Sequence, residues 1–194
     1  MPRISTQEFR RLPLRAHDFL ADVPLHDVWV IDLPRRRPGI TLDEFMRAAG
    51  GLPFTPSPIV RALLSVRFFV GRLLGWDRES RATAKESFAS RLTTGDISKS
   101  LTPAGTRQGP FRIVYRFENE QLLELANRTV HAAALSALVE TATDYHFYFG
   151  VYVRSVNRWT PTYMRLIDPF RKWIVYPSLL KSVRHTWNHI FGTA

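Results

Sequence analysis

Cysteine is absent from the chain. Its absence excludes disulfides, thiolate metal sites and cysteine nucleophiles. Long apolar runs are also missing, since no stretch reaches the about 18 uncharged apolar residues that a membrane-spanning helix requires. The beginning of the chain, MPRISTQEFRRLPLRAHDFL, has no apolar core of signal-peptide length. We therefore expect a cytoplasmic protein.

The motifs that commonly mark a reaction are missing as well. The sequence has no glycine-rich phosphate loop and no serine elbow of the form G-x-S-x-G. His185 and His189 stand four residues apart, which is a metal-ligand spacing on a helix, but no third ligand accompanies them. We expect neither a metal nor a cofactor.

Basic residues outnumber acidic ones, with 27 Lys and Arg against 17 Asp and Glu and a net charge of +10. The densest run, Arg35 to Arg37, directly precedes Pro-Gly and has no nucleic-acid motif beside it. The charge predicts a surface that attracts anions, and we expect no nucleic-acid partner. The length of 194 residues and the 45% of hydrophobic residues are typical of one globular domain.

The first half of the chain predicts one strand followed by two helices. Residues 26–34 (HDVWVIDLP) alternate as a strand does, and Pro34 ends it. A TLDE capping box at Thr41 begins a short helix over 42–51. Ser57 and Pro58 begin a second, strongly apolar helix over 59–76. Residues 77–109 are rich in Ser, Thr, Gly and Lys and indicate loops, with a short strand near Phe88 to Leu92.

The second half predicts four strands with short connections. The segments FRIVYRFE, QLLELAN, RTVHAAALSALV and YHFYFGVYVRSV begin at residues 111, 121, 128 and 145. Because alternation in the first and last places apolar side chains on one face, we expect a sheet with one buried and one wet face. Connections this short favour an antiparallel meander.

Thr160 as N-cap with Pro161 as first residue predicts a helical turn, and Asp168 with Pro169 repeats this signal. The segment that follows, DPFRKWIVYPSLLKSVRHTWNHIF, predicts a long amphipathic helix. Its apolar residues recur at three- and four-residue steps: Phe170, Trp173, Ile174, Pro177, Leu180, Val183, Trp187 and Ile190. Pro177 therefore lies on the stripe that faces the sheet. Either it bends the helix into an arch with a space beneath, or it separates two short helices above a filled core.

This order of elements resembles the helix-grip fold of the START-like (SRPBCC) superfamily. More narrowly, ANRTVHAAALSAL and VYVRSVNRWTPTYMRLIDPFRKWIVYPSLL resemble a bacterial family of unknown function, with similarity over residues 26–192. The resemblance implies an α+β fold: a curved antiparallel sheet wrapped around a long C-terminal helix, with two short helices after the first strand. It implies a single domain, 1–194, with 1–25 as a partly ordered N-terminal extension. It supplies no activity and no catalytic residues.

The candidate site consists of residues on the predicted inner faces. An apolar pocket with a few polar groups is the usual small-molecule site, although the same side chains can simply form a core. His131 stands among small residues, where it can hold a polar group, act as a base or play a structural part. The residues expected to bind a ligand are Tyr115, His131, Phe149, Tyr163 and Trp173.

Three functions remain open from the sequence. The first is binding of an apolar or amphipathic small molecule in a cavity between the sheet and the C-terminal helix. The second is a cyclase or dehydratase that uses His131 with Tyr115 or Tyr163 as acid and base. The third is attachment to an anionic membrane surface through residues 59–76. It ranks below the others because burial explains the same apolar face. The sequence does not indicate an oligomeric state.

Overall fold

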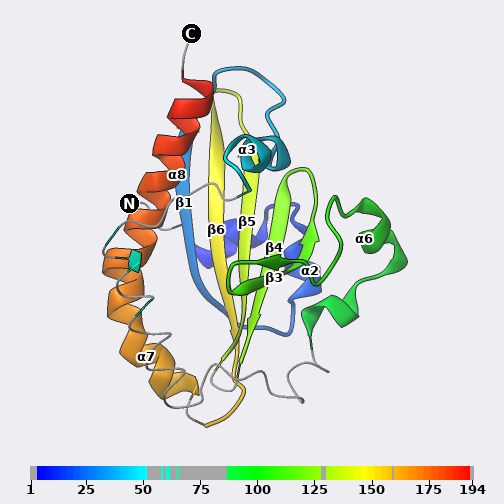
Figure 1. The fold of residues 1–194 in the computed structure, drawn as a ribbon, viewed down its shortest axis with the longest axis vertical. Helices are drawn as coiled ribbons and strands as arrows, with labels where there is room; N and C mark the ends of the chain where they lie inside the picture. Colours follow the sequence, from blue (N-terminus) through cyan, green and yellow to red (C-terminus); the bar gives the residue numbers. More distant parts are fainter. Residues whose placement is uncertain are drawn as a thin grey trace.

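The computed structural model describes residues 4–51, 87–127, 130–158 and 160–192, together with positions 58, 60, 61 and 65. It is an α+β fold built on one six-stranded antiparallel sheet with the order β1-β6-β5-β4-β3-β2. A long C-terminal helix runs along one face of this sheet beside β1 (Figure 1). The predicted helix-grip arrangement is therefore confirmed. The predicted helix over 59–76 lies mostly outside the described residues.

The elements have the following bounds. The strands are β1 (Leu25–Pro34), β2 (Arg107–Gln108), β3 (Phe111–Arg116), β4 (Glu120–Ala126), β5 (His131–Glu140) and β6 (Asp144–Arg154). The helices are α1 (Thr6–Arg10), α2 (Arg15–Phe19), α3 (Leu42–Ala48), the 3-10 helix η1 (Phe88–Arg91), α6 (Thr94–Lys99), α7 (Thr160–Phe170), the π-helical turn η2 (Arg171–Val175) and α8 (Tyr176–Phe191). No helix in the described part is long and apolar enough to cross a membrane.

Most strands and the first helix lie where the sequence predicts them. The hairpins β3-β4, β4-β5 and β5-β6 confirm the antiparallel meander. Thr41 caps α3 by accepting a hydrogen bond from the Glu44 amide, while the Glu44 side chain pairs with Arg37 instead of completing the capping box. The predicted strand near Phe88 is wrong, because Ser87 caps a 3-10 helix there.

Both faces of the sheet are covered, and each carries its own core. We call the side under the C-terminal helix the helix face; its buried sheet residues are Trp29, Ile31, Leu33, Leu138, Tyr145, Phe147, Phe149, Val151 and Val153. We call the other side the cover face; its buried sheet residues are Val28, Val30, Val114, Tyr115, Leu122, Ala133, Leu135, Ala137, Tyr148 and Tyr152. Burial on both faces differs from the predicted one wet face. It follows from the helices that the N-terminal segment adds.

The N-terminal segment packs its two short helices on the cover face. Phe9 of α1, Ala16 and Phe19 of α2, and Leu20 are buried there. Gly150 of β6 makes room for this contact, because a Cβ at that position would lie 3.3 Å from the Phe9 ring. A side chain at position 150 would therefore push α1 away from the sheet.

The C-terminal helix is continuous from Thr160 to Phe191 and contains a π turn in its middle. In that turn the Tyr176 amide donates to the Arg171 carbonyl, five residues back. Pro177 explains the turn. In an uninterrupted α-helix its ring would clash with the Trp173 carbonyl, four residues earlier. The wider turn accommodates the ring, and the helix bends there with its convex side away from the sheet (Figure 1).

The π turn shifts the phase of the buried stripe. Inward residues before it are Thr160, Met164, Ile167 and Arg171; those after it are Tyr176, Leu180, Val183 and Trp187. The step between the two sets is five residues, so the first half is rotated by about 100° relative to an uninterrupted helix. Phe170 and Trp173 therefore face solvent, and the prediction that they face the sheet is wrong. The predicted inward positions of Leu180, Val183 and Trp187 are confirmed.

The predicted helix start at Asp168 is also wrong. Asp168 and Pro169 lie inside α7, and Asp168 caps nothing because the helix continues through both residues. The helix instead begins at Thr160, whose amide donates to Asn157 Oδ1 at 3.2 Å. Its hydroxyl accepts hydrogen bonds from the amides of Val156 and Asn157.

Because the π turn adds one residue between the two buried stripes, a one-residue deletion should be tolerated within the turn and not beyond it. Deletion of Trp173 combined with Pro177→Ala should convert the π turn to an α turn while both buried stripes keep their positions. We expect an unfolding free energy within about 1 kcal/mol of wild type in urea denaturation.

The matched control deletes Lys181 in the same Pro177→Ala background. This deletion rotates Val183 and Trp187 out of the core and should cost at least about 3 kcal/mol. Equal losses from the two deletions would contradict the role given to the π turn.

Candidate functional site

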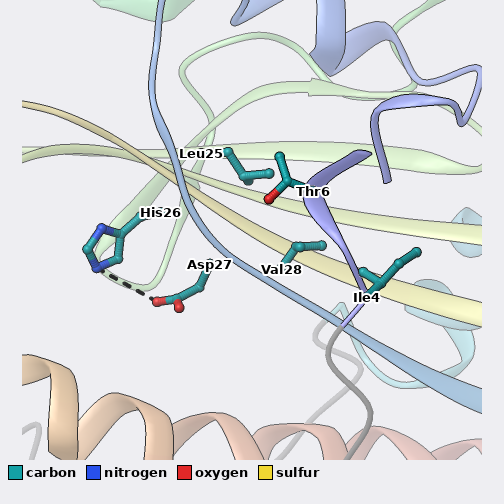
Figure 2. Close-up of a pocket in the computed structure, with 6 residues that line it drawn as sticks. All are labelled: Ile4, Thr6, Leu25, His26, Asp27 and Val28. Atoms are coloured by element: carbon teal, nitrogen blue, oxygen red, sulfur yellow. Dashed lines mark ion pairs between the residues drawn. The ribbon is translucent and has the colours of Figure 1, made fainter. Parts of the chain in front are cut away.

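The start of β1 carries a β-bulge that redirects its side chains. The pairing of β1 with β6 shifts register between Leu25 and Asp27, so that His26 is the extra residue. Bulges commonly re-aim side chains in this way. Figure 2 shows His26 and Asp27 on the side of β1 that faces the C-terminal helix, with Leu25 and Val28 on the other side.

The bulge and the π turn bring their side chains into one group, which we call the ionic cluster: His26, Asp27, Asp168, Arg171 and Lys172. Arg171 Nη2 lies 2.7 Å from Asp27 Oδ2. Asp168 receives Lys172 Nζ at 2.9 Å and His26 Nε2 at 3.0 Å on separate oxygens. The cluster joins the edge strand to the middle of the C-terminal helix.

The cluster is balanced in charge and mostly shielded from solvent. Two carboxylates face two permanent cations, and the Asp27 and Arg171 side chains are largely buried. Burial raises the pKa of Asp168, but hydrogen bonds from Lys172 and His26 outweigh it and leave that pKa below its usual value. Arg171 also donates to the Tyr176 hydroxyl at 2.8 Å, which ties the π turn to the start of α8.

The ionic cluster does not suit a metal ion. Within the described ranges, His26, Asp27 and Asp168 are the only group of three possible ligands, with ligand atoms within 4.8 Å of one another. Each of their carboxylate oxygens already faces a nitrogen of Arg171, Lys172 or His26. A metal would have to displace these cations. His185 and His189 are exposed on α8, and neither belongs to such a group.

A partly open pocket of about 160 Å³ adjoins the cluster. Its walls are Ile4 and Thr6 from the N-terminal segment and Leu25, His26, Asp27 and Val28 from β1 (Figure 2). Small-molecule sites usually enclose about 300–1,000 Å³. This pocket is therefore too small to enclose an amphipathic ligand by itself.

Two buried glutamates of β4 hold the cover elements on the opposite face of the sheet. Glu120 accepts hydrogen bonds at 2.8 Å from the amides of Arg15 and Ala16 at the start of α2. The Tyr115 hydroxyl also donates to it, at 2.5 Å. Because α2 has no side-chain cap of its own, Glu120 satisfies the amides at the start of that helix.

Glu124 binds the start of η1 in the same way as Glu120 binds the start of α2. It accepts hydrogen bonds from the Phe88 amide at 2.8 Å and the Ser87 hydroxyl at 2.6 Å. His131 Nε2 lies 2.5 Å from Glu124 Oε1, the same oxygen that accepts from the Phe88 amide, and a carboxylate can only accept, so the imidazole donates. The Phe88 ring stacks on the imidazole with centroids 4.0 Å apart.

The two glutamates have pKa values shifted in opposite directions. Burial raises the pKa of Glu120, and the hydrogen bonds from Tyr115, Ala16 and Arg15 only partly offset it. Burial also acts on Glu124, but the hydrogen bonds from His131, Ser87 and Phe88 outweigh it and lower the pKa. The difference reflects a histidine that donates to one carboxylate and not to the other.

The five residues expected to bind a ligand do not converge. Tyr115 and His131 lie on the cover face, each bonded to its own glutamate, and His131 is 1% exposed. Phe149 lies on the helix face against Tyr176. Trp173 is exposed on the outer side of the π turn. Tyr163 belongs to α7, and its side chain lies outside the described part.

Sequence reasoning missed the partners that matter most. Glu124 and His131 face each other because Ala126 pairs with His131 across the β4-β5 hairpin. The alternation of Glu120, Leu122 and Glu124 would have placed both glutamates on one face, but no pattern fixed the hairpin register. The pair Asp27 and Arg171 depends on the bulge, which has no local signal in the sequence, and on the π turn, for which Pro177 signals a disturbed helix but not the five-residue step.

Removal of one partner of the ion pair between Asp27 and Arg171 should destabilise the protein, whereas replacement of both partners by apolar residues should not. Asp27→Ala leaves a largely buried guanidinium without its carboxylate and should lower the unfolding free energy by about 3 kcal/mol. The double variant Asp27→Leu with Arg171→Met should lie within about 1 kcal/mol of wild type. Urea denaturation measures both values.

The exposed pair between Arg37 and Glu44 provides the control. Glu44→Ala should cost less than about 1 kcal/mol because solvent screens that pair. If the double variant at 27 and 171 had an unfolding free energy no higher than that of Asp27→Ala, the two side chains would not stabilise the fold as a pair.

The opposite pKa shifts predict opposite pH responses for two variants. Because the pKa of Glu124 is lowered, its contribution is present above the usual value near 4.5 and is lost as the pH falls through the folded value. Because the pKa of Glu120 is raised, its contribution is full below 4.5 and is lost as the pH rises through the folded value. The stability advantage of wild type over Glu124→Gln should shrink on acidification, and that over Glu120→Gln should grow.

Urea denaturation from about pH 6 to about pH 3 tests these slopes. The two glutamates share one strand and one face, so each variant is the control for the other. If the stability advantage of wild type over both variants changed in the same direction with pH, the pKa values of Glu120 and Glu124 would not be shifted in opposite directions.

The chain matches the model of a family described as Protein of unknown function (DUF2867) over residues 19–178. No curated protein and no solved structure matches it significantly. The matched segment spans 160 residues (178 − 19 + 1) and includes the ionic cluster and both buried glutamates. Because the match covers more than half of the chain, the protein belongs to this family of unknown function.

Proposed function

We propose that the protein binds a small apolar or amphipathic molecule between α7 and the helix face of the sheet. The observation that carries the proposal is a change in packing along the C-terminal helix at the π turn. Beyond the turn, Leu180, Val183 and Trp187 of α8 are fully buried. Before it, the residues buried in α7 are Thr160 and Met164, as far as the structure describes this helix.

The exposed fraction of the β6 side chains on the helix face also differs between the part beneath α8 and the part nearer α7. Phe147 is 1% exposed, whereas Phe149, Val151 and Val153 farther along β6 are each 9% exposed. β6 ends one loop before α7 begins, and Val151 pairs with Asp27, which contacts the π turn. The apolar surface of β6 thus continues past the closely packed part of the helix.

The neighbouring strand carries small side chains on the same face. Ala132 and Ala134 of β5 pair with Val153 and Val151 and lie on the helix face, half-buried. An apolar ligand would pack on these alanines and valines, with Met164 above it. The ionic cluster lies at the α8 end of this surface and offers His26 and Lys172 to the polar group of an amphipathic molecule.

The geometry favours binding over the cyclase or dehydratase alternative. An acid and a base must converge on a substrate in one accessible site. His131 and Tyr115 are buried against Glu124 and Glu120, on the face of the sheet away from α7. Their contacts fit the task of holding η1 and α2.

A filling substitution tests the proposed site. Ala132→Leu should occupy the space beneath α7 and lower the affinity for the fluorescent amphipathic probe 1-anilinonaphthalene-8-sulfonate at least about tenfold, the equivalent of about 1.4 kcal/mol. Ala89→Leu is the matched control, because Ala89 is a half-buried alanine packed on the cover face. It should leave probe binding unchanged. Fluorescence titration of the three proteins measures the difference.

Native mass spectrometry of protein purified from its own host, followed by denaturing extraction, provides a second test. We expect a bound apolar molecule that is released on unfolding and is absent from Ala132→Leu. Recovery of no ligand from wild type, together with equal probe binding by all three proteins, would refute the proposal.

A further inference from the structure

The outer side of α7 and the π turn presents three large apolar side chains to solvent. Leu166 is 68% exposed, Phe170 50% and Trp173 79%. They follow at steps of four and three residues and so lie on one side of the helix. We call them the apolar stripe. The stripe exists because the π turn rotates the first half of the helix and directs these residues outward.

Basic residues surround the apolar stripe. From Thr160 to Gly192 the cationic residues are Arg165, Arg171, Lys172, Lys181 and Arg184, and Asp168 is the one acidic residue. Arg165 is exposed beside Leu166 and has no ion-pair partner among the described residues; the same holds for Lys181 on α8. The stripe therefore combines apolar side chains with unneutralised positive charge.

A second copy of the chain does not fit this surface. In a symmetric contact the same patch meets itself, so Arg165 and Lys181 would face like charges from the other molecule. The three side chains expose roughly 400 Å², given that a buried Phe or Trp covers about 150–250 Å². A stable interface needs about 800 Å² from each partner.

An anionic bilayer fits both the shape and the charge. Leu166, Phe170 and Trp173 are each at least half exposed, and the helix that carries them bends with its convex side away from the sheet (Figure 1). Protruding Trp, Phe and Leu enter the boundary between headgroups and acyl chains, and Trp prefers this depth. Arginine at the same surface meets lipid phosphates.

We propose that the apolar stripe docks the protein on an anionic phospholipid surface, with Leu166, Phe170 and Trp173 among the acyl chains and Arg165 at the level of the phosphates. This surface is distinct from the ligand site beneath α7. The proposal therefore stands or fails separately from ligand binding.

Co-sedimentation with lipid vesicles tests the proposal. Wild type should bind vesicles of phosphatidylcholine mixed with phosphatidylglycerol and should not bind phosphatidylcholine alone. Raising the salt concentration should weaken binding severalfold because it screens the charges. The triple variant Leu166→Gln, Phe170→Gln and Trp173→Gln should lower the partition coefficient at least about tenfold, since it removes most of the inserted apolar surface. Arg165→Glu should also weaken binding to the anionic vesicles.

Ile97 and Leu101 provide the matched control, because they are exposed apolar residues near α6, on the far side of the sheet from the C-terminal helix (Figure 1). Ile97→Gln with Leu101→Gln should bind vesicles as wild type does. Brominated lipid should quench part of the fluorescence of the five tryptophans, and Trp173→Phe should remove that part while binding persists.

Three outcomes would overturn the proposal. The first is a wild type that sediments with neither kind of vesicle. The second is a triple variant that binds as well as wild type. The third is self-association in sedimentation equilibrium that the triple variant abolishes without any vesicle binding, which would assign the stripe to a second copy.

Discussion

The steric conflict between the Pro177 ring and the carbonyl four residues earlier decides how the C-terminal helix meets the sheet. A π turn relieves this conflict and adds one residue to a helical turn. The half of the helix before the turn is therefore rotated relative to the half after it. One result is that Arg171 points inward and reaches Asp27. The other is that Trp173 points outward. A buried ion pair and an exposed aromatic thus have a single cause.

The carboxylates on the two faces of the sheet have different kinds of partner. On the helix face, carboxylates and cations neutralise one another at the edge of the sheet. On the cover face, Glu120 and Glu124 accept hydrogen bonds from main-chain amides and from neighbouring side chains. The first arrangement fixes the middle of a helix, and the second fixes the beginnings of α2 and η1.

The sequence identified most strands and α3, but not α1, α2 or α6, and it did not predict the contacts between elements. Period-two alternation and short connections identified β3 to β6, and Thr41 identified α3. The phase of the C-terminal helix could not be predicted, because a π turn is a response to Pro177 and to packing on β1 and has no residue pattern of its own. The pairing of Glu124 with His131 depended on a hairpin register that alternation alone leaves open. Both failures concern positions where tertiary contacts choose between locally equivalent arrangements.

The attachment of α2 has an evolutionary consequence. Glu120 grips main-chain amides, which every residue other than proline carries, so the bond is indifferent to the side chains at positions 15 and 16. Substitutions at the exposed positions of α2 should therefore leave this attachment intact, whereas replacement of the single residue Glu120 would remove it. The buried residues Ala16 and Phe19 remain constrained by their packing on the sheet.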